Sequence, residues 1–155
     1  MGTQQILMIV LSVIIVGIAV GVGITMFQNQ AVNSNRQAVI ADLTNFASQA
    51  IAYYKVPATM GGGGNGTPGF REGEGTTPTS GLLSYIGFLS SGGETPTYTY
   101  SNDNGTYTLT IAGPENLTIT GTGKELLGGS PVAAELTIDM TPDAGQSQYK
   151  VTITR

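Results

Sequence analysis

Hydrophobic residues are concentrated in one long run near the start of the chain. The segment from Ile6 to Phe27 consists almost entirely of Ile, Val, Leu, Met, Ala and Gly, and no charged side chain occurs between Met1 and Asn35. As a helix, a run of ~22 residues at ~1.5 Å per residue is roughly 33 Å long, which matches a bilayer core of ~30 Å. We therefore expect residues 1–28 to form a hydrophobic helix that is able to span a membrane.

The pattern changes after Phe27, but no turn signal separates the two parts. Residues 29–56 contain apolar side chains three, four and seven positions apart, which is the spacing of one helix face. These apolar positions are Val32, Val39, Leu43, Phe46, Ala47, Ala50 and Tyr54. Pro57 is the first proline of the chain and disfavours helical geometry at Val56, so we expect one continuous helix that ends near Lys55.

The next segment, residues 57–96, is rich in Gly, Thr and Pro and has no periodicity that would form a core. Its apolar positions suit one short amphipathic helix and are Leu82, Leu83, Ile86 and Leu89. Ser80 precedes them as the expected N-cap, and Gly92 follows them as a stop signal. We therefore expect a loop that carries one short helix.

In residues 97–155 the apolar positions recur every second residue, which is the pattern of strands with one buried face. Between two of these segments, Asn102–Gly105 supplies residues that tolerate positive φ in a hairpin turn. About five such segments are present. The prediction is an α+β fold, in which Leu43, Phe46 and Tyr54 of the long helix cover an antiparallel sheet.

The composition narrows the functions that the chain can have. Its 155 residues are enough for one anchor and one domain of about 100 residues. The net charge is −4 and the 6 Lys and Arg residues are scattered singly, whereas nucleic-acid binding needs clustered basic side chains. Cys and His are both absent, which removes the commonest metal ligands and general bases. We therefore expect no enzyme activity, no cofactor, no metal site and no nucleic-acid partner.

Three N-x-Thr sequons occur, at Asn65, Asn104 and Asn116. Each is compatible with N-glycosylation, and turn formation is the alternative interpretation because Asn also favours turns. Asp103-Asn104-Gly105 resembles part of a calcium loop, but the other oxygen ligands at fixed spacing are missing, so a hairpin turn is the better interpretation. The glycines of residues 61–66 lack the Lys-Ser/Thr of a phosphate-binding loop.

The order of these parts resembles the type IV pilin superfamily. In that family a charge-free hydrophobic helix runs directly into an amphipathic half, which a Gly-rich loop and an antiparallel sheet then wrap. The order of parts covers the whole chain. The stretch from Gln37 to Tyr54, QAVIADLTNFASQAIAYY, also looks like the second half of a bacterial pilin helix, including its aromatic end.

The resemblance implies a structural subunit, a major pilin, of a type IV pilus or a related extracellular filament with a mechanical and adhesive role. Such subunits wait in the cytoplasmic (inner) membrane and are then extracted, so that their apolar helices bundle into the core of a homopolymer at the cell surface. Besides the membrane and other copies of the chain, a prepilin peptidase and the pilus assembly machinery are implied partners. The residues expected in the bundled core are Ile6, Leu7, Ile9, Val10, Val13, Ile14, Val16, Gly17, Val20, Gly21, Ile24 and Phe27.

Three glycines lie inside the hydrophobic run, at Gly17, Gly21 and Gly23. They permit either close approach of a neighbouring helix or local unwinding, at a cost of ~1 kcal/mol each relative to Ala. Bacterial pilins often have a melted segment near this depth that is marked by Pro. This run has no Pro, so unwinding is allowed but not compelled.

The start of the helix departs from the family pattern. Pilin helices usually carry a Glu at the fifth position, which neutralises the terminal amine of a neighbouring subunit. This chain has Gln5 there if Met1 is the first mature residue, and Leu7 there if a short leader ends at Gly2. In either case we expect Gln4 and Gln5 to hydrogen-bond neighbouring Gln side chains or the free N-terminus.

Two other functions are compatible with the sequence. A pseudopilin of a type II secretion-like apparatus would be favoured by a calcium site in the C-terminal half or by a Glu near the start, and the sequence pattern offers neither. A single-pass membrane-anchored binding module would keep its activity when Met1–Gln28 is deleted, whereas a pilin would lose assembly.

Overall fold

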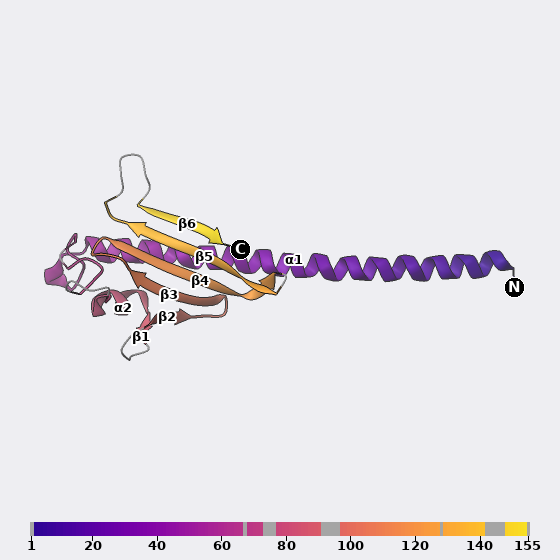
Figure 1. Cartoon of the computed structure of the whole chain (residues 1–155), viewed down its shortest axis with the longest axis horizontal. Helices are drawn as coiled ribbons and strands as arrows, with labels where there is room; N and C mark the ends of the chain where they lie inside the picture. The colour runs from indigo at the N-terminus through magenta and orange to yellow at the C-terminus, as the bar shows by residue number, and fades with distance from the viewer. Residues whose placement is uncertain are drawn as a thin grey trace.

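The computed structural model describes residues 2–66, 68–72, 77–90, 97–127, 129–141 and 148–154. Within these residues, a long N-terminal helix packs on a six-stranded antiparallel sheet (Figure 1). The helical elements are α1 (Thr3–Lys55), the 3-10 turn η1 (Ala58–Met60) and α2 (Ser80–Ile86). The strands are β1 (Leu89–Ser90), β2 (Tyr98–Ser101), β3 (Gly105–Ile111), β4 (Asn116–Leu127), β5 (Ser130–Asp139) and β6 (Tyr149–Thr154). The predicted α+β fold is confirmed.

The element α1 is one continuous helix of 53 residues. At ~1.5 Å per residue its length is about 80 Å. It passes through Gly17–Gly23 without a break, so the unwinding that these glycines allow does not occur in the single chain. It ends at Lys55, because Val56 adopts extended geometry (φ −70°, ψ 133°) ahead of Pro57. The predicted end of the helix is therefore confirmed.

The sheet is a meander whose strand order, β1-β2-β3-β4-β5-β6, follows the chain, and each neighbouring pair is antiparallel. The sequence predicts about five strands, and the additional one is β1, in which Leu89 pairs with Thr99. The predicted helical position of Leu89 is wrong. The helix α2 stops at Ile86 because Gly87 adopts the left-handed conformation, with φ 79°.

The start of α2 also differs from the prediction by one residue. Thr79, and not Ser80, is the N-cap, because the Thr79 hydroxyl oxygen accepts a hydrogen bond of 3.3 Å from the Leu82 N–H. The same hydroxyl lies 2.8 Å from the Tyr53 hydroxyl of α1. The cap therefore also fastens α2 to the long helix.

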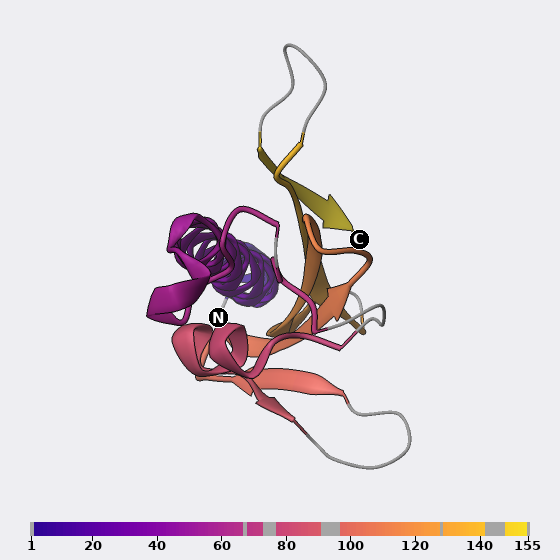
Figure 2. The ribbon, with the colours of Figure 1, turned by 90° about the vertical axis from the view of Figure 1, so that its left-hand side faces the viewer.

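One face of the C-terminal half of α1 packs against one face of the sheet, as the view along the helix shows (Figure 2). All the apolar positions predicted for this half are buried, and Tyr53 is buried beside them. Phe46 is central, with its ring centroid 5.3 Å from those of Phe88 and Tyr100 and 5.1 Å from that of Tyr107. The sheet contributes buried side chains from alternate strand positions, namely Tyr107, Leu109, Ile111, Leu117, Ile119, Leu136 and Ile138. The predicted cover of the sheet is confirmed.

The helix lies close to β4 because two glycines of that strand leave room for it. A Cβ atom on Gly121 would lie 3.0 Å from the Tyr107 ring and 3.0 Å from Val39 Cγ1. A Cβ atom on Gly123 would overlap Oδ1 of Asn35. A larger residue at either position would push α1 away from the sheet.

The turn between β2 and β3 is formed by Asn102–Gly105, as predicted, but its geometry is different. None of these four residues adopts positive φ. Instead, Asn102 Oδ1 accepts hydrogen bonds from the N–H groups of Asn104 (2.9 Å) and Gly105 (3.0 Å), and the Asn102 N–H donates to the Gly105 carbonyl (3.0 Å). The Asn102 side chain therefore closes the turn as an Asx-type turn.

On β2 and β3, the face of the sheet opposite α1 is lined by hydroxyl side chains. The strand register places Thr108 beside Thr120 and Thr110 beside Thr118 on this face. The β2 and β3 segments contain no charged residue. The outward face of these two strands therefore meets water through uncharged hydroxyl groups.

Candidate functional site

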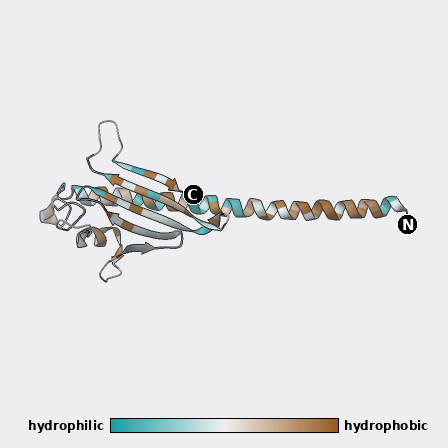
Figure 3. Cartoon of the chain, in the orientation of Figure 1, coloured by the Kyte–Doolittle hydropathy of each residue, from teal (hydrophilic) through white to brown (hydrophobic). Residues whose placement is uncertain are grey.

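The N-terminal half of α1 projects from the head, which is the part of the chain from Ala31 onward (Figure 1). All side chains in residues 2–30 are exposed, and burial begins at Ala31 and Val32. Figure 3 shows that the projecting half is also strongly hydrophobic. The residues from Ile6 to Phe27, named the apolar shaft below, are therefore open to the surroundings in the single chain.

Apolar side chains surround the shaft on every side. Ile6, Leu7, Met8 and Ile9 follow one another around the helix axis, and they are 56%, 70%, 72% and 62% exposed. By length and composition this helix is able to cross a membrane, and none of its apolar shaft is buried within the chain. A helix that is apolar all round needs apolar neighbours on every side. Lipid or other apolar helices meet that need.

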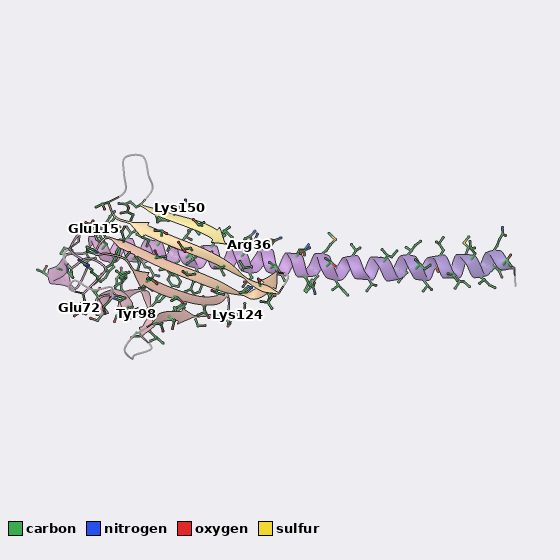
Figure 4. All side chains as sticks on the ribbon, viewed as in Figure 1. Arg36, Glu72, Tyr98, Glu115, Lys124 and Lys150 are labelled. Carbon is green, nitrogen blue, oxygen red and sulfur yellow. The ribbon has the colours of Figure 1, made fainter. Side chains whose placement is uncertain are left out.

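The charged side chains lie elsewhere. Arg36 is the first charged residue of the sequence, and Figure 4 shows it at the base of the head, where the projecting half begins. The other labelled charged residues, among them Glu115 and Lys150, also lie on the head (Figure 4). The change of environment along α1 is therefore sharp.

Two hydroxyl side chains of the shaft are bonded to the helix itself. The Ser12 hydroxyl donates to the Ile9 carbonyl at 2.8 Å, and the Thr25 hydroxyl donates to the Gly21 carbonyl at 3.1 Å. These bonds satisfy the hydroxyl hydrogens without water. The shaft can therefore enter a water-free environment without leaving these two donors unpaired.

The predicted core residues all lie on the shaft and are all exposed. The prediction omitted further apolar residues of the same stretch that are exposed to a similar degree, namely Met8, Leu11, Ile15, Ile18, Val22 and Met26. Because the shaft is apolar all round, no single face separates the two sets. The hydropathy of the whole run, and not one helix face, is the sequence signal that identifies the omitted residues as well.

The glycines of the shaft have no function within the single chain. A Cβ atom on Gly17, Gly21 or Gly23 would meet nothing within 4 Å. Each glycine costs the helix ~1 kcal/mol relative to Ala, and no contact inside the molecule offsets this cost. Gly17 and Gly21 are four residues apart and so share one side of the helix, where they leave room for close approach by another chain.

The polar start of α1 contributes Gln4 and Gln5, which are both exposed. The Gln5 N–H donates to the Gly2 carbonyl at 2.9 Å and closes the first turn, which contains no acidic residue. The contacts expected from these side chains to neighbouring copies stay a prediction.

A cluster around Asp42 fixes α1 to the β2–β3 hairpin. Its Oδ2 atom accepts hydrogen bonds from Asn102 Nδ2 (2.8 Å), Asn104 Nδ2 (2.9 Å) and the Tyr107 hydroxyl (2.6 Å). Two turns closer to the shaft, Asn35 Nδ2 donates to the Asn104 carbonyl at 2.8 Å. We name Asp42, Asn102, Asn104 and Tyr107 the Asp42 latch. The helical periodicity of the sequence leaves Asp42 off the apolar face and gives no signal for this role.

The latch favours a charged carboxylate and a neutral phenol. Burial raises the pKa of Asp42, but the hydrogen bonds from Asn104, Tyr107 and Asn102 together outweigh it and hold the pKa below its ordinary value of 3.8. Burial, together with the hydrogen bond to Asp42 and its negative charge, raises the pKa of the Tyr107 hydroxyl. Tyr107 therefore stays a donor and Asp42 an acceptor at neutral pH.

The C-terminal end of α1 is also tied to the head. The Tyr54 hydroxyl donates to Glu115 Oε1 at 3.3 Å, in addition to the hydrogen bond between the Tyr53 and Thr79 hydroxyls. The carbonyls of Tyr53 and Tyr54 accept hydrogen bonds from the N–H groups of Gly63 (2.9 Å) and Asn65 (3.0 Å). The helix therefore holds the loop after it in place.

The three sequons lie in different surroundings. Asn65 is exposed and adopts positive φ (55°), and its sequon includes Thr67, which lies outside the described residues. Asn104 is half-buried and donates its side-chain amide to Asp42, so in the folded chain it has a turn and latch role. Asn116 is exposed at the start of β4. Glycosylation stays a prediction at all three.

Within the described residues, no group of three or more His, Cys, Asp or Glu side chains is placed to hold a metal ion. Asp103-Asn104-Gly105 forms a hairpin turn, as the sequence predicts. No protein-family model, curated protein or solved structure matches this chain.

Proposed function

We propose that this chain is a structural subunit, of the major pilin type, in a type IV pilus or a related extracellular filament. In this proposal the shafts of many copies bundle into the filament core, the heads form its outer surface, and the chain catalyses no reaction. Before assembly the shaft lies in the cytoplasmic membrane. The observation that carries the proposal is the shaft itself, which is apolar all round, entirely unburied and continuous with a helix fixed to the head.

The arrangement of the elements supports the proposal. A long N-terminal helix packed on an antiparallel sheet is compatible with a pilin-like fold. Burying the ~20 apolar side chains of the shaft at ~1.5 to 3 kcal/mol each would stabilise a bundle strongly against water. The side-chain ties between α1 and the head, at Asn35, Asp42, Tyr53 and Tyr54, would transmit a pull on the helix directly to the surface domain.

The glycines allow a test that leaves membrane insertion intact. Gly21→Leu keeps the shaft apolar but fills the space in which another helix could approach. We expect the variant to reach the membrane at the wild-type level and to yield at least about tenfold fewer filaments, the effect of ~1.4 kcal/mol per subunit contact. Filaments are counted by electron microscopy of material sheared from cells that also express a pilus assembly apparatus.

The matched control is Ile15→Leu, which conserves volume in the same shaft and should assemble like the wild type. The proposal would be contradicted if the wild-type chain is inserted into the membrane of these cells but forms no filaments. Equal assembly of Gly21→Leu and Ile15→Leu would remove the packing argument drawn from the glycines.

A membrane-anchored binding module is the second candidate. It is favoured by the fit between the shaft and the thickness of a bilayer, since the same helix passes the length and composition test for a membrane span. It predicts that the chain stays a monomer in the membrane and that Gly21→Leu changes nothing. The filament assay therefore separates the two functions.

A further inference from the structure

The core face of the sheet is uncovered at its last strand. The register places Tyr149, Val151 and Ile153 of β6 beside Ile138, Leu136 and Ala134 of β5 on the face that α1 covers. The three β5 residues are 0%, 0% and 1% exposed, whereas Tyr149 is 41% and Ile153 is 46% exposed. Val151 is half-buried. The apolar face therefore extends beyond the cover that α1 provides.

The flank of α1 on this side is apolar too. Asp42 faces the β2–β3 hairpin, and Ile40, two positions earlier, is turned away from it by about 200°. In the same way Tyr53 faces Thr79, and Ile51 is turned away from that side. Because the strand order runs from β1 to β6, this opposite flank faces the β5–β6 side of the sheet. Ile40 and Ile51 are both half-buried.

Together these residues form a charge-free edge strip, namely Ile40, Ile51, Tyr149, Val151 and Ile153. It has one wall on α1 and one on β6, and these two elements contact each other. Figure 1 shows β6 pointing toward the end of the head from which the shaft leaves. The strip therefore leads along α1 toward the shaft.

We propose that the edge strip receives the apolar shaft of a second copy of this chain, running alongside α1. The inference rests on the proposed filament function and names one of its contacts. A helix that packs beside α1 has its axis ~8–10 Å away, and the packing typical of bundles would cross it at a shallow angle of ~20°. If such a neighbour extends past the base of the head, it meets the strip next.

The apolar character of both surfaces favours this occupant. The shaft offers on the order of 1,000 Å² of apolar area around its whole circumference, at the ~60 Å² per large side chain that corresponds to ~1.5 kcal/mol. Only the side of the shaft that faces the strip contributes to this contact, so the contact adds to the bundling of the shafts and is smaller than the ~800 Å² per partner of a standard interface. The shaft and the five strip residues lack charged side chains, and Arg36, at the base of the head, is the charge that a neighbouring shaft passes to reach the strip.

The first test places a charge on the strip and compares it with the same charge one residue away. Ile153→Glu carries the charge on the core face of β6, and Thr152→Glu carries it on the opposite, exposed face of the same strand. We expect Ile153→Glu to lower the filament yield at least about tenfold and Thr152→Glu to leave it unchanged. Because Ile153 is already 46% exposed, we expect both variants to fold, which circular dichroism and thermal unfolding check.

The second test uses the absence of cysteine from the sequence. Copies with Ile153→Cys are assembled together with copies that carry one cysteine at successive shaft positions. We expect disulfide-linked dimers in filaments from a subset of shaft positions, and none when Thr152→Cys replaces Ile153→Cys.

Each outcome decides something different. Wild-type filaments with full assembly of Ile153→Glu would overturn the inference and leave the filament function standing. Linkage between two Ile153→Cys copies without a shaft cysteine would also overturn it, because the strip would then contact another head. A wild-type chain that forms no filaments would contradict the proposed function and this inference together.

Discussion

At the scale of single residues, Asp42 links the helix to the sheet. Three donors from the hairpin converge on one of its oxygens, and the nearest of these, the Tyr107 hydroxyl, lies 2.6 Å away. The sequence predicts the hairpin from Asn102–Gly105, since turn propensity is local. It does not predict the latch, because Asp42 and Tyr107 are far apart in sequence and meet only when the helix is seated.

The latch predicts a loss of stability in acid. Because the folded state lowers the pKa of Asp42 below 3.8, its contribution is complete above that ordinary value and is lost as the pH falls through the folded-state pKa. We expect the free energy of unfolding to fall as the pH drops below the ordinary pKa of 3.8, measured by urea unfolding. Asp42→Asn is the control and should show a smaller loss over the same range. Equal acid sensitivity of both proteins would contradict the latch.

At the scale of elements, the long helix and the main strands follow from local pattern. A period near four gives α1 its buried face, a period of two gives the strands, and Pro57 marks the end of α1. The predictions for the end of α2 and for β1 are wrong because the conformation of a single residue determines where the helix stops. Gly87 adopts φ 79° and ends α2 early, which leaves Leu89 free to pair as β1. Such conformations depend on the surrounding contacts.

The close contact between α1 and β4 predicts an effect of one substitution. Gly121→Val would add side-chain atoms where a Cβ alone already lies 3.0 Å from Val39 and Tyr107. We expect the head to lose about 1–3 kcal/mol of unfolding free energy through overpacking, measured by denaturant unfolding. Gly113→Ala is the control, because its nearest neighbour is 3.9 Å away. Equal stability of the two variants would show that α1 does not sit tightly on β4.

At the scale of the whole molecule, one helix has two environments. Among the described residues, every buried hydrophobic side chain lies at Val32 or beyond, so the shaft adds nothing to the core of the head. The sequence predicts the shaft well, because hydropathy alone identifies it. The edge strip could not be predicted, since the exposure of Tyr149 and Ile153 depends on how far α1 covers the sheet.

This division predicts that the head is independent of the shaft. Deleting residues 2–28 should leave a soluble monomer. Its unfolding free energy should lie within about 0.5 kcal/mol of the value for the head of the full-length chain in detergent, since no buried contact is removed. Urea unfolding and sedimentation measure stability and mass. The same deletion should abolish filaments. An unfolded or aggregated head would show that the shaft supports the fold.

In the proposed function, the shaft is surrounded first by lipid and then by other copies of itself. The most direct measurement is an electron cryomicroscopy reconstruction of filaments sheared from cells that express the full chain. We expect a homopolymer with Ile6–Phe27 of many copies packed at the axis and the sheets outside. A sheared fraction without filaments, together with monomeric chain in the membrane fraction, would contradict it.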